Sequence, residues 1–209
     1  MITVFGGQTS RSLRVVWLME EMGLDYRVRQ VDMLSDEVDA EFVAANPATY
    51  IPVLRDGDVT MVESIAIMEY LMARYGPTPM APAPDDPAFP AYQQFLHLGE
   101  AGLAALMMTP IVSRFLAPEA ERDNWGAAWA KAAAEKRLRL VRRQLEQAPY
   151  MAGDRFTAAD ISVAYALELG RQHEVASLGE AEHAYLARTM GRDAYKRALE
   201  KSQPEAAEA

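Results

Sequence analysis

The chain has 209 residues, of which half are hydrophobic and 24% are charged, and its formal net charge at pH 7 is −9. This length can bury the core of one compact domain or of two small ones, and the negative charge makes nucleic acid an unfavourable partner. The chain has no cysteine, which excludes disulfides, thiolate metal sites and a cysteine nucleophile.

The sequence contains no run of 18 apolar residues, so no membrane-spanning helix is predicted. Its first residues also lack the basic and apolar segments of a secretory signal. We therefore expect a soluble cytoplasmic protein that has no membrane partner.

The first residues predict a β-α-β unit. Residues 2–5 form a short apolar run typical of a strand, and residues 12–22 show the periodicity of a helix, which Gly23 ends. Residues 26–32 predict a second strand. Because a helix connects the two strands, we expect them to pair in parallel.

The next elements complete a recognisable order. Ser35 is typical of the N-cap of a helix that stops before Asn46-Pro47, and two strands, at 53–54 and 59–62, flank the turn residues Asp56-Gly57-Asp58. A further helix begins at Ser64, which fits its N-cap. The resulting order, β-α-β-α-β-β-α, is typical of a thioredoxin-like fold.

The second half is helical and begins after a proline-rich segment. Six of the twelve prolines lie between Pro77 and Pro90, which predicts a linker. Beyond it, helices are expected near 88–117, 120–147, 157–171, 179–190 and 191–201. We therefore predict an α/β plus all-α protein, with a thioredoxin-like domain at 1–76, a linker at 77–88, an all-helical domain at 89–203 and a frayed tail at 204–209.

Two segments of the first half contain candidate binding residues. Pro52 opens a strand after a loop, so it either starts that strand in the ordinary way or forms a cis bond that turns the backbone of Ile51 outward. A free edge of this kind can pair with an extended peptide. At the start of a helix, Glu63 can pair with an ammonium group, and Ser64 either caps the helix or contacts a ligand carboxylate.

A third candidate segment precedes the first helix. The hydroxyls of Thr9, Ser10 and Ser12 are typical of helix caps, and they can also donate a hydrogen bond to an anion at the positive end of that helix. Lowering the pKa of a free thiol by two units takes about 2.7 kcal/mol, which one such bond and the helix field can supply.

Other templates are absent from the sequence. It has no G-x-S-x-G, P-loop or G-x-G-x-x-G motif, and its three histidines lack the spacing of a metal site. His97 fits either a cleft or a satisfied position in the core, and Met107 fits either core packing or a permissive apolar pocket. Thr157 and Asp160 predict a capping box with a structural role.

Taken together, these segments resemble the cytosolic glutathione transferases over nearly the whole chain. The resemblance rests on residues 10–23, which match the opening helix SRS-x-R-x-x-W-L-L-E-E-L-G of bacterial and fungal members. It also rests on the loop at 46–54 leading into a proline, on the Glu-Ser-x-Ala-Ile element at 63–67 and on the F-T-x-A-D-I motif at 156–161. The order and spacing of the four motifs identify the family.

The resemblance implies that the first domain holds glutathione and that the helical domain supplies much of a second-substrate pocket, within a homodimer that needs no metal. Ser10 would stabilise the glutathione thiolate, with Thr9 and Ser12 as alternatives. Glutathione would be bound by Tyr50, Ile51, Pro52, Glu63 and Ser64, and the second substrate by Tyr92, His97, Glu100 and Met107.

Two positions depart from the family pattern, since Thr49 replaces a frequent glycine and Tyr50 replaces a lysine or glutamine. The absence of a tyrosine near the first strand and of any cysteine leaves the serine type. The expected function is a glutathione transferase that attacks a small hydrophobic electrophile. The alternatives are a binding protein of the same fold without turnover, and a glutathione-dependent disulfide reductase or peroxidase.

Overall fold

The computed structural model describes residues 1–7, 10–33 and 39–203. The chain divides into two compact units. One consists of Met1–Met80 with the C-terminal segment from Arg192 onward, and the other of Ala81–Gly191. The first unit is the α/β part and the second is wholly helical, as the sequence predicted.

The first unit is built on a four-stranded sheet in the order β2-β1-β3-β4. Its strands are β1 (Ile2–Gly6), β2 (Tyr26–Gln30), β3 (Val53–Asp56) and β4 (Val59–Val62). β1 and β2 pair in parallel, as predicted, whereas β1 with β3 and β3 with β4 pair antiparallel. Gly57 turns the β3–β4 hairpin with a φ of +59°, a conformation that favours glycine.

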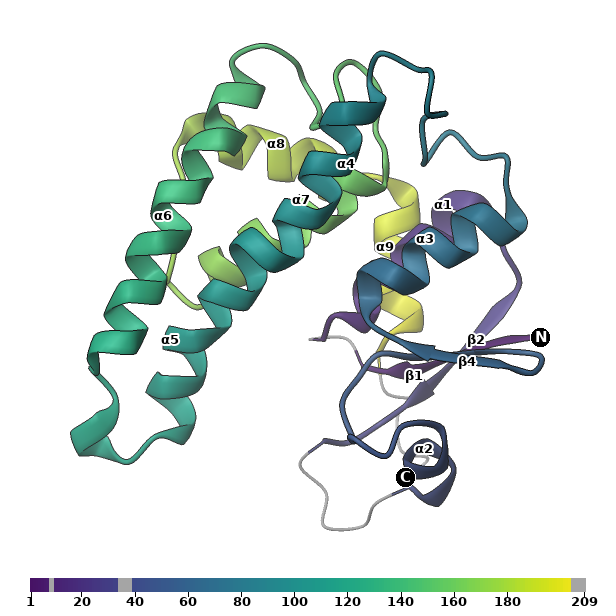
Figure 1. Ribbon diagram of the computed structural model, residues 1–209, viewed down its shortest axis with the longest axis horizontal. Coiled ribbons are helices and arrows are strands. Elements are labelled where there is room, and N and C mark those ends of the chain that lie inside the picture. The colour runs from purple at the N-terminus through teal and green to yellow at the C-terminus, as the bar shows by residue number, and fades with distance from the viewer. Residues whose placement is uncertain (8–9, 34–38, 204–209) are drawn as a thin grey trace. The chain divides into compact units, whose positions relative to one another are not determined.

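Helices cover both faces of this sheet. α1 (Ser12–Met22) and α3 (Ser64–Tyr75) lie side by side on one face, and α2 (Ala40–Ala45) lies on the other (Figure 1). Phe42 of α2 packs there against Phe5 and Val53, which are opposite each other on neighbouring strands. Asp39 caps α2 by accepting hydrogen bonds from the next turn, while the predicted cap, Ser35, lies outside the described residues.

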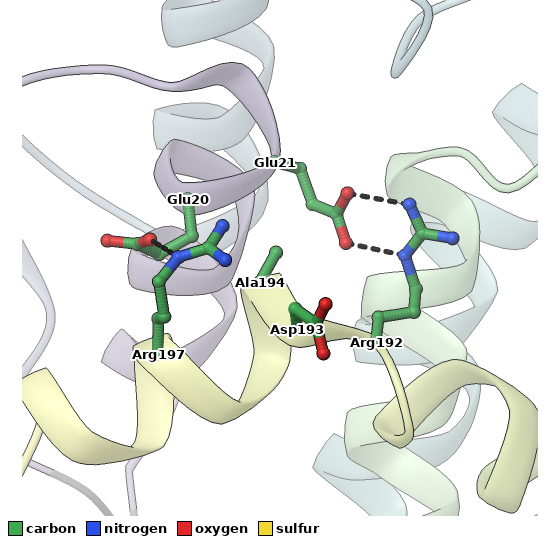
Figure 2. Close-up of a pocket in the computed structure, with 6 residues that line it drawn as sticks. All are labelled: Glu20, Glu21, Arg192, Asp193, Ala194 and Arg197. Carbon is green, nitrogen blue, oxygen red and sulfur yellow. Dashed lines mark hydrogen bonds and ion pairs between the residues drawn. The ribbon is translucent and has the colours of Figure 1, made fainter.

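The last helix, α9 (Asp193–Lys201), belongs to the first compact unit. We expected it in the helical domain, but it packs against α1 of the first unit, where the Tyr195 and Trp17 rings lie 4.7 Å apart. Figure 2 shows the Arg192 guanidinium paired with both carboxylate oxygens of Glu21, at 2.6 and 2.8 Å. Helical periodicity shows which face of a helix is buried but does not show which unit buries it.

The helical unit contains one long helix in three parts, α4 (Phe89–His97), a π-helical stretch η1 (Leu98–Ala104) and α5 (Ala105–Leu116). α6 (Trp125–Leu145), α7 (Ala158–Gln172) and α8 (Glu180–Met190) complete the four helices that were predicted here, and a single 3₁₀ turn, η2 (Glu119–Glu121), precedes α6. The linker between Tyr75 and α4 contains a cis peptide bond at Gly76–Pro77.

The unit is organised around α7, in which 11 of the 15 residues are buried. A Cβ atom on Gly99 of η1 would lie 2.3 Å from the Ser162 Oγ of α7, so the two helices meet where only glycine fits. At the start of α7, the predicted capping box is present, because the Thr157 N–H donates to the Asp160 carboxylate at 2.9 Å. This motif has the structural role expected from the sequence.

The helix Phe89–Leu116 is long enough to span a membrane, and the mean hydropathy of its most apolar window, 1.4, also fits a span. In the structure, 44% of that window is buried, and the helix packs against α6 and α7. These contacts are those of an inner helix of a bundle, which passes the same test of length and composition.

Candidate active site

The sheet register brings the three candidate segments of the first unit together. Phe5, Val53 and Val62 form one row across β1, β3 and β4. Val53 and Val62 are terminal residues of their strands and Phe5 is one residue from the end of β1, so the chain beyond each one enters or leaves the sheet at the same edge. The turn that contains Ser10, the loop that contains Ile51 and the junction at Glu63 therefore meet at this edge.

In the turn between β1 and α1, two serine hydroxyls contact each other and one carbonyl. The Ser10 and Ser12 Oγ atoms lie 2.6 Å apart, and each lies 2.8 Å from the Gly7 carbonyl oxygen. Ser12 is 1% exposed, whereas Ser10 is half-buried. Of these two candidates, only Ser10 keeps a surface through which a ligand can be reached, and Thr9 lies outside the described residues.

Ser10 also occupies the positive end of α1. The helix begins two residues later, and the Ser10 Oγ accepts a hydrogen bond from the Ser12 N–H at 3.2 Å. Arg11 occupies the N-cap position without a side-chain cap, so the Ser10 hydroxyl satisfies an N–H of the first turn from the position before the cap. Its position among the first N–H groups of a helix is also one where negative charge is stabilised.

In the loop before β3, Ile51 and Pro52 are joined by a cis peptide bond, which settles the alternative that the sequence left open. Asn46, which is 4% exposed, fixes this loop from within. Its Nδ2 donates to the Tyr50 carbonyl oxygen at 2.7 Å, and its Oδ1 accepts from the Ala48 N–H at 3.0 Å. Because β3 starts at Val53, the backbone of Ile51 lies outside the sheet ladder.

The third segment, between β4 and α3, has a rare backbone conformation. Glu63 adopts a φ of 70° without being glycine, as residues at ligand sites often do. The Tyr50 hydroxyl donates to its carboxylate at 3.1 Å. Desolvation and this hydrogen bond raise the pKa of Tyr50 above its ordinary value of 10, so the hydroxyl stays protonated and remains a donor.

Ser64 does not cap α3, in contrast to the sequence-based alternative. It is the first residue of the helix, Glu63 occupies the N-cap position, and no side chain caps the helix there. The Ser64 side chain is 2% exposed, and its Oγ accepts a hydrogen bond from Arg14 Nη1 at 3.2 Å. The group that Ser64 can offer a ligand is therefore its backbone N–H at the start of α3.

Sequence reasoning missed the structural role of Arg14. Its side chain is fully buried, and it connects α1 to the first residue of α3. The signal was an arginine between Leu13 and Val15 on the apolar side of a helix, where a charged residue is rarely buried without partners. Arg14 places a cation under the helix end where we expected a carboxylate to bind.

The residues predicted for a second-substrate pocket lie in the helical unit and have different environments. His97 is exposed at the end of α4, and Glu100 is half-buried in η1. Tyr92 is 2% exposed and Met107 is fully buried. A Cβ atom on Gly170 of α7 would lie 2.9 Å from the Met107 sulfur, so Met107 packs inside the unit, as the alternative interpretation held.

Neither the possible metal ligands nor the pocket at α9 indicates a further ligand site among the described residues. No group of three His, Asp or Glu side chains there is placed to hold a metal ion. The shallow pocket in Figure 2, between the end of α1 and α9, is lined mainly by charged side chains. Glu20 and Glu21 of this pocket pair with Arg197 and Arg192 across it, so these ion pairs join α9 to α1.

Comparisons with known proteins match both units. Residues 1–73 match the family model described as "Glutathione S-transferase, N-terminal domain", and residues 103–207 match "Glutathione S-transferase, C-terminal domain". Among curated proteins, the chain is 29% identical over 172 residues to glutathione S-transferase 3 of Schizosaccharomyces pombe, covering 77% of this chain and 70% of that protein. It is 31% identical over 160 residues to a probable maleylacetoacetate isomerase of Caenorhabditis elegans, covering 75% and 72% of the two chains.

A solved structure shows the same likeness in three dimensions. It is a theta class glutathione S-transferase of Xanthomonas axonopodis pv. citri with glutathione bound. The two chains superpose with a TM-score of 0.79 at 27% identity, over 95% of this chain and 96% of the other.

Proposed function

The chain belongs to the glutathione S-transferase family, and on this premise we propose that it binds glutathione at the sheet edge described above and activates its thiol for attack on a small electrophile. The observation that supports this most strongly is the convergence of three segments at one edge: a hydroxyl at the start of α1, a backbone outside the ladder at Ile51 and an acidic residue at the start of α3.

We assign the stabilisation of the glutathione thiolate to the hydroxyl of Ser10. A free thiol has a pKa near 8.5, so only a few per cent of it is ionised at pH 7, and lowering that pKa by two units takes about 2.7 kcal/mol. A hydrogen bond to a charged group contributes about 1.5–3 kcal/mol, and a helix end adds about 0.3–1 kcal/mol. Ser10 and the start of α1 supply both contributions within one turn of chain.

The remaining groups suit the two ends of the tripeptide. The backbone of Ile51 can pair with the cysteinyl residue, because the sheet ladder does not use it. The Glu63 carboxylate can pair with the γ-glutamyl ammonium, and the Ser64 N–H can donate to the adjacent carboxylate at the positive end of α3. Tyr50, whose side chain is 39% exposed, is placed to contact the glycyl end.

The chemistry follows from these roles. The glutathione sulfur attacks the electrophile directly, since the chain has no cysteine to form a mixed disulfide. Catalysis then comes from ionising the thiol and from holding two reactants together. Addition, halide displacement and isomerisation all begin with this attack. In the helical unit, the polar groups that we propose for contact with a second substrate are the exposed His97 and the half-buried Glu100.

The experiment has two steps, retention on immobilised glutathione and turnover of an aryl halide. We expect both, and we expect Ser10→Ala to raise the pKa of the bound thiol by about 1–2 units, with a loss of roughly 10–100-fold in kcat/KM at pH 7. Ser177→Ala, at an exposed serine of the helical unit, is the matched control and should change neither quantity.

Other outcomes would point to other functions. If the protein is retained but turns over no member of a broad panel of electrophiles, it is a binding protein of this fold. If it turns over only glutathione mixed disulfides or organic hydroperoxides, it is a reductase or peroxidase. An unchanged thiol pKa in Ser10→Ala would show that another group stabilises the thiolate.

We also propose that the protein is a homodimer of the cytoplasm, as the resemblance implied. The support within the structure is a row of exposed apolar side chains on α6, where Trp125 is 80%, Trp129 52% and Leu140 43% exposed. Exposed apolar groups that gather on one helix face often mark a protein contact. Light scattering on the purified chain should give twice the monomer mass, and a monomer mass would contradict the proposal.

A further inference from the structure

We propose that Ser12 is a positioning residue for the thiolate site and acts through Ser10: its buried hydroxyl donates to the Ser10 Oγ while the Ser10 hydroxyl donates to the bound thiolate. This inference rests on the proposed function. The sulfur contacts Ser10 alone, and Ser12 determines where the Ser10 proton points.

The argument begins with a count of protons. Each serine hydroxyl has one proton to donate, and the structure places three oxygen–oxygen contacts among Ser10 Oγ, Ser12 Oγ and the Gly7 carbonyl, at 2.6, 2.8 and 2.8 Å. All three distances fall in the hydrogen-bonding range for hydroxyls. Two protons can make only two of these three hydrogen bonds, so each serine proton has more than one possible acceptor.

Hydrogen bonds from the backbone show which of the two hydroxyl protons can turn toward a ligand. The Gly7 N–H donates to the Ser12 Oγ at 3.0 Å, so this oxygen already accepts one hydrogen bond without the Ser10 hydroxyl. The Gly7 carbonyl also accepts from the Ser10 N–H at 3.2 Å, so it keeps a donor when the Ser10 hydroxyl turns away. The Ser10 proton can therefore rotate toward a ligand, and the Ser12 proton can then point to the Ser10 Oγ.

Ser12 cannot take the place of Ser10 in this arrangement. Its side chain is 1% exposed and lies against the backbone of Gly6, where an added Cβ atom would be 2.2 Å from the Ser12 Cβ. A ligand therefore does not reach the Ser12 hydroxyl. In a chain of hydrogen bonds, each donor polarises the next by roughly 10–30%, so Ser12 should strengthen the bond that Ser10 makes to the anion.

No covalent step is involved. The glutathione thiol loses its proton to solvent, and both serines keep theirs, so the two hydroxyls only change the direction in which they donate. The expected result is a thiol pKa that is lower by a few tenths of a unit when both hydroxyls are present than when Ser10 acts alone.

The test is a double-mutant cycle on the full chain, with glutathione as the probe and thiolate absorbance in the ultraviolet as the readout of its pKa. The variants are Ser10→Ala, Ser12→Ala and the double variant. We expect Ser12→Ala to raise the thiol pKa by a few tenths of a unit when Ser10 is present and by nothing when Ser10 is already alanine. The melting temperature of each variant records any change in stability.

A purely structural role for Ser12 predicts a different result, since the shift would be the same in both backgrounds or absent from both, and either outcome overturns the inference. If Ser12→Ala does not fold, Ser12→Cys keeps a weaker donor of similar size and should give an intermediate shift, with the introduced thiol measured in a sample without glutathione. If the wild-type protein binds no glutathione, both this inference and the proposed function fail. If it binds glutathione with a lowered pKa but without coupling, only the inference fails.

Discussion

Asn46 offers the sharpest test of how the loop before β3 positions a ligand. The change is Asn46→Ala, which removes the donor to the Tyr50 carbonyl at 2.7 Å and the acceptor for the Ala48 N–H at 3.0 Å. Each neutral hydrogen bond contributes about 1 kcal/mol net, so the free energy of unfolding should fall by about 2 kcal/mol. Urea denaturation measures this loss.

The same change should weaken glutathione binding, because Tyr50 and Ile51 depend on that loop. Losing about 1 kcal/mol from the anchor at Tyr50 lets the loop adopt other conformations, and the apparent Kd should rise about fivefold. Asn46→Asp keeps an acceptor for Ala48 but sets a buried carboxylate oxygen against the Tyr50 carbonyl, so it should weaken binding at least as much and lose at least as much stability. Titration calorimetry with glutathione measures both variants.

The helical unit contains a matched control for this experiment. The side chain of Asn124 also bonds in both directions, since it accepts from the Ala127 N–H at 2.9 Å and donates to the Ser113 Oγ at 2.9 Å and to the Glu121 carbonyl oxygen at 2.8 Å. Asn124→Ala should therefore cost a similar free energy of unfolding and leave the Kd for glutathione unchanged. The reasoning is refuted if Asn46→Ala loses stability as the control does but binds glutathione as tightly as the wild type.

Three further changes test separate parts of the structure. Tyr50→Phe removes the bond to Glu63, so the KM for glutathione should rise about two- to threefold with kcat unchanged. Because the pair is exposed, the free energy of unfolding should change by less than about 0.5 kcal/mol. A lower KM would mean that Tyr50 competes with the ligand. Gly6→Ala places a Cβ atom 2.2 Å from the Ser12 side chain at the start of α1, so the free energy of unfolding, measured by urea denaturation, should fall by about 1–3 kcal/mol or more. In Gly7→Ala the nearest atom to the new Cβ is 3.5 Å away, so the loss should be smaller. Equal losses in the two variants would contradict this. Burial raises the pKa of Asp160 from 3.8 to about 6, so the folded state holds the proton more tightly than the unfolded state does. The contribution of this group to the free energy of unfolding is therefore full below pH 3.8 and declines by about 3 kcal/mol as the pH rises to about 6. The stability difference between wild type and Asp160→Asn should follow this slope in urea denaturation at pH 4 to 7, and a constant difference would show that the carboxyl is ionised throughout.

The parts of the fold that sequence reasoning predicted depend on local signals. Gly23 ends α1 with a φ of 65°, and Gly57 turns the hairpin with a φ of 59°, as their positions after a periodic segment and between two strands indicated. The capping box of α7 involves residues only three apart. Each of these signals works over a few residues, so no knowledge of the tertiary structure is needed to read it.

The parts that were missed depend on contacts between distant segments. The docking of α9 on α1 joins residues more than 170 positions apart, for example Arg192 and Glu21. The hydroxyl of Ser64 bonds to Arg14, fifty positions away, so a residue with the sequence preferences of an N-cap became the first residue of the helix. The π-helical turn at Leu98–Ala104 leaves no distinct pattern of apolar residues.

The candidate site shows the same division. Its residue types came from four motifs whose order resembled a family, but the ranking of its hydroxyls needed the structure. Ser10 and Ser12 differ by two positions and are chemically identical, and only the close approach of Gly6 to Ser12 shows which of them is buried. In the helical unit, Met107 is likewise a core residue because α7 brings Gly170 against it.

The net charge of −9 does not argue against the proposed site for an anionic thiolate. At physiological ionic strength charges are screened over about 8 Å, so acidic residues spread over the chain act weakly at any one point. The groups at the sheet edge act within hydrogen-bonding distance instead. They are backbone N–H groups at two helix ends, a hydroxyl and a buried guanidinium beneath α3. The proposed anion site would be built from directed donors and would need no excess of basic residues, so the composition of the chain cannot indicate it.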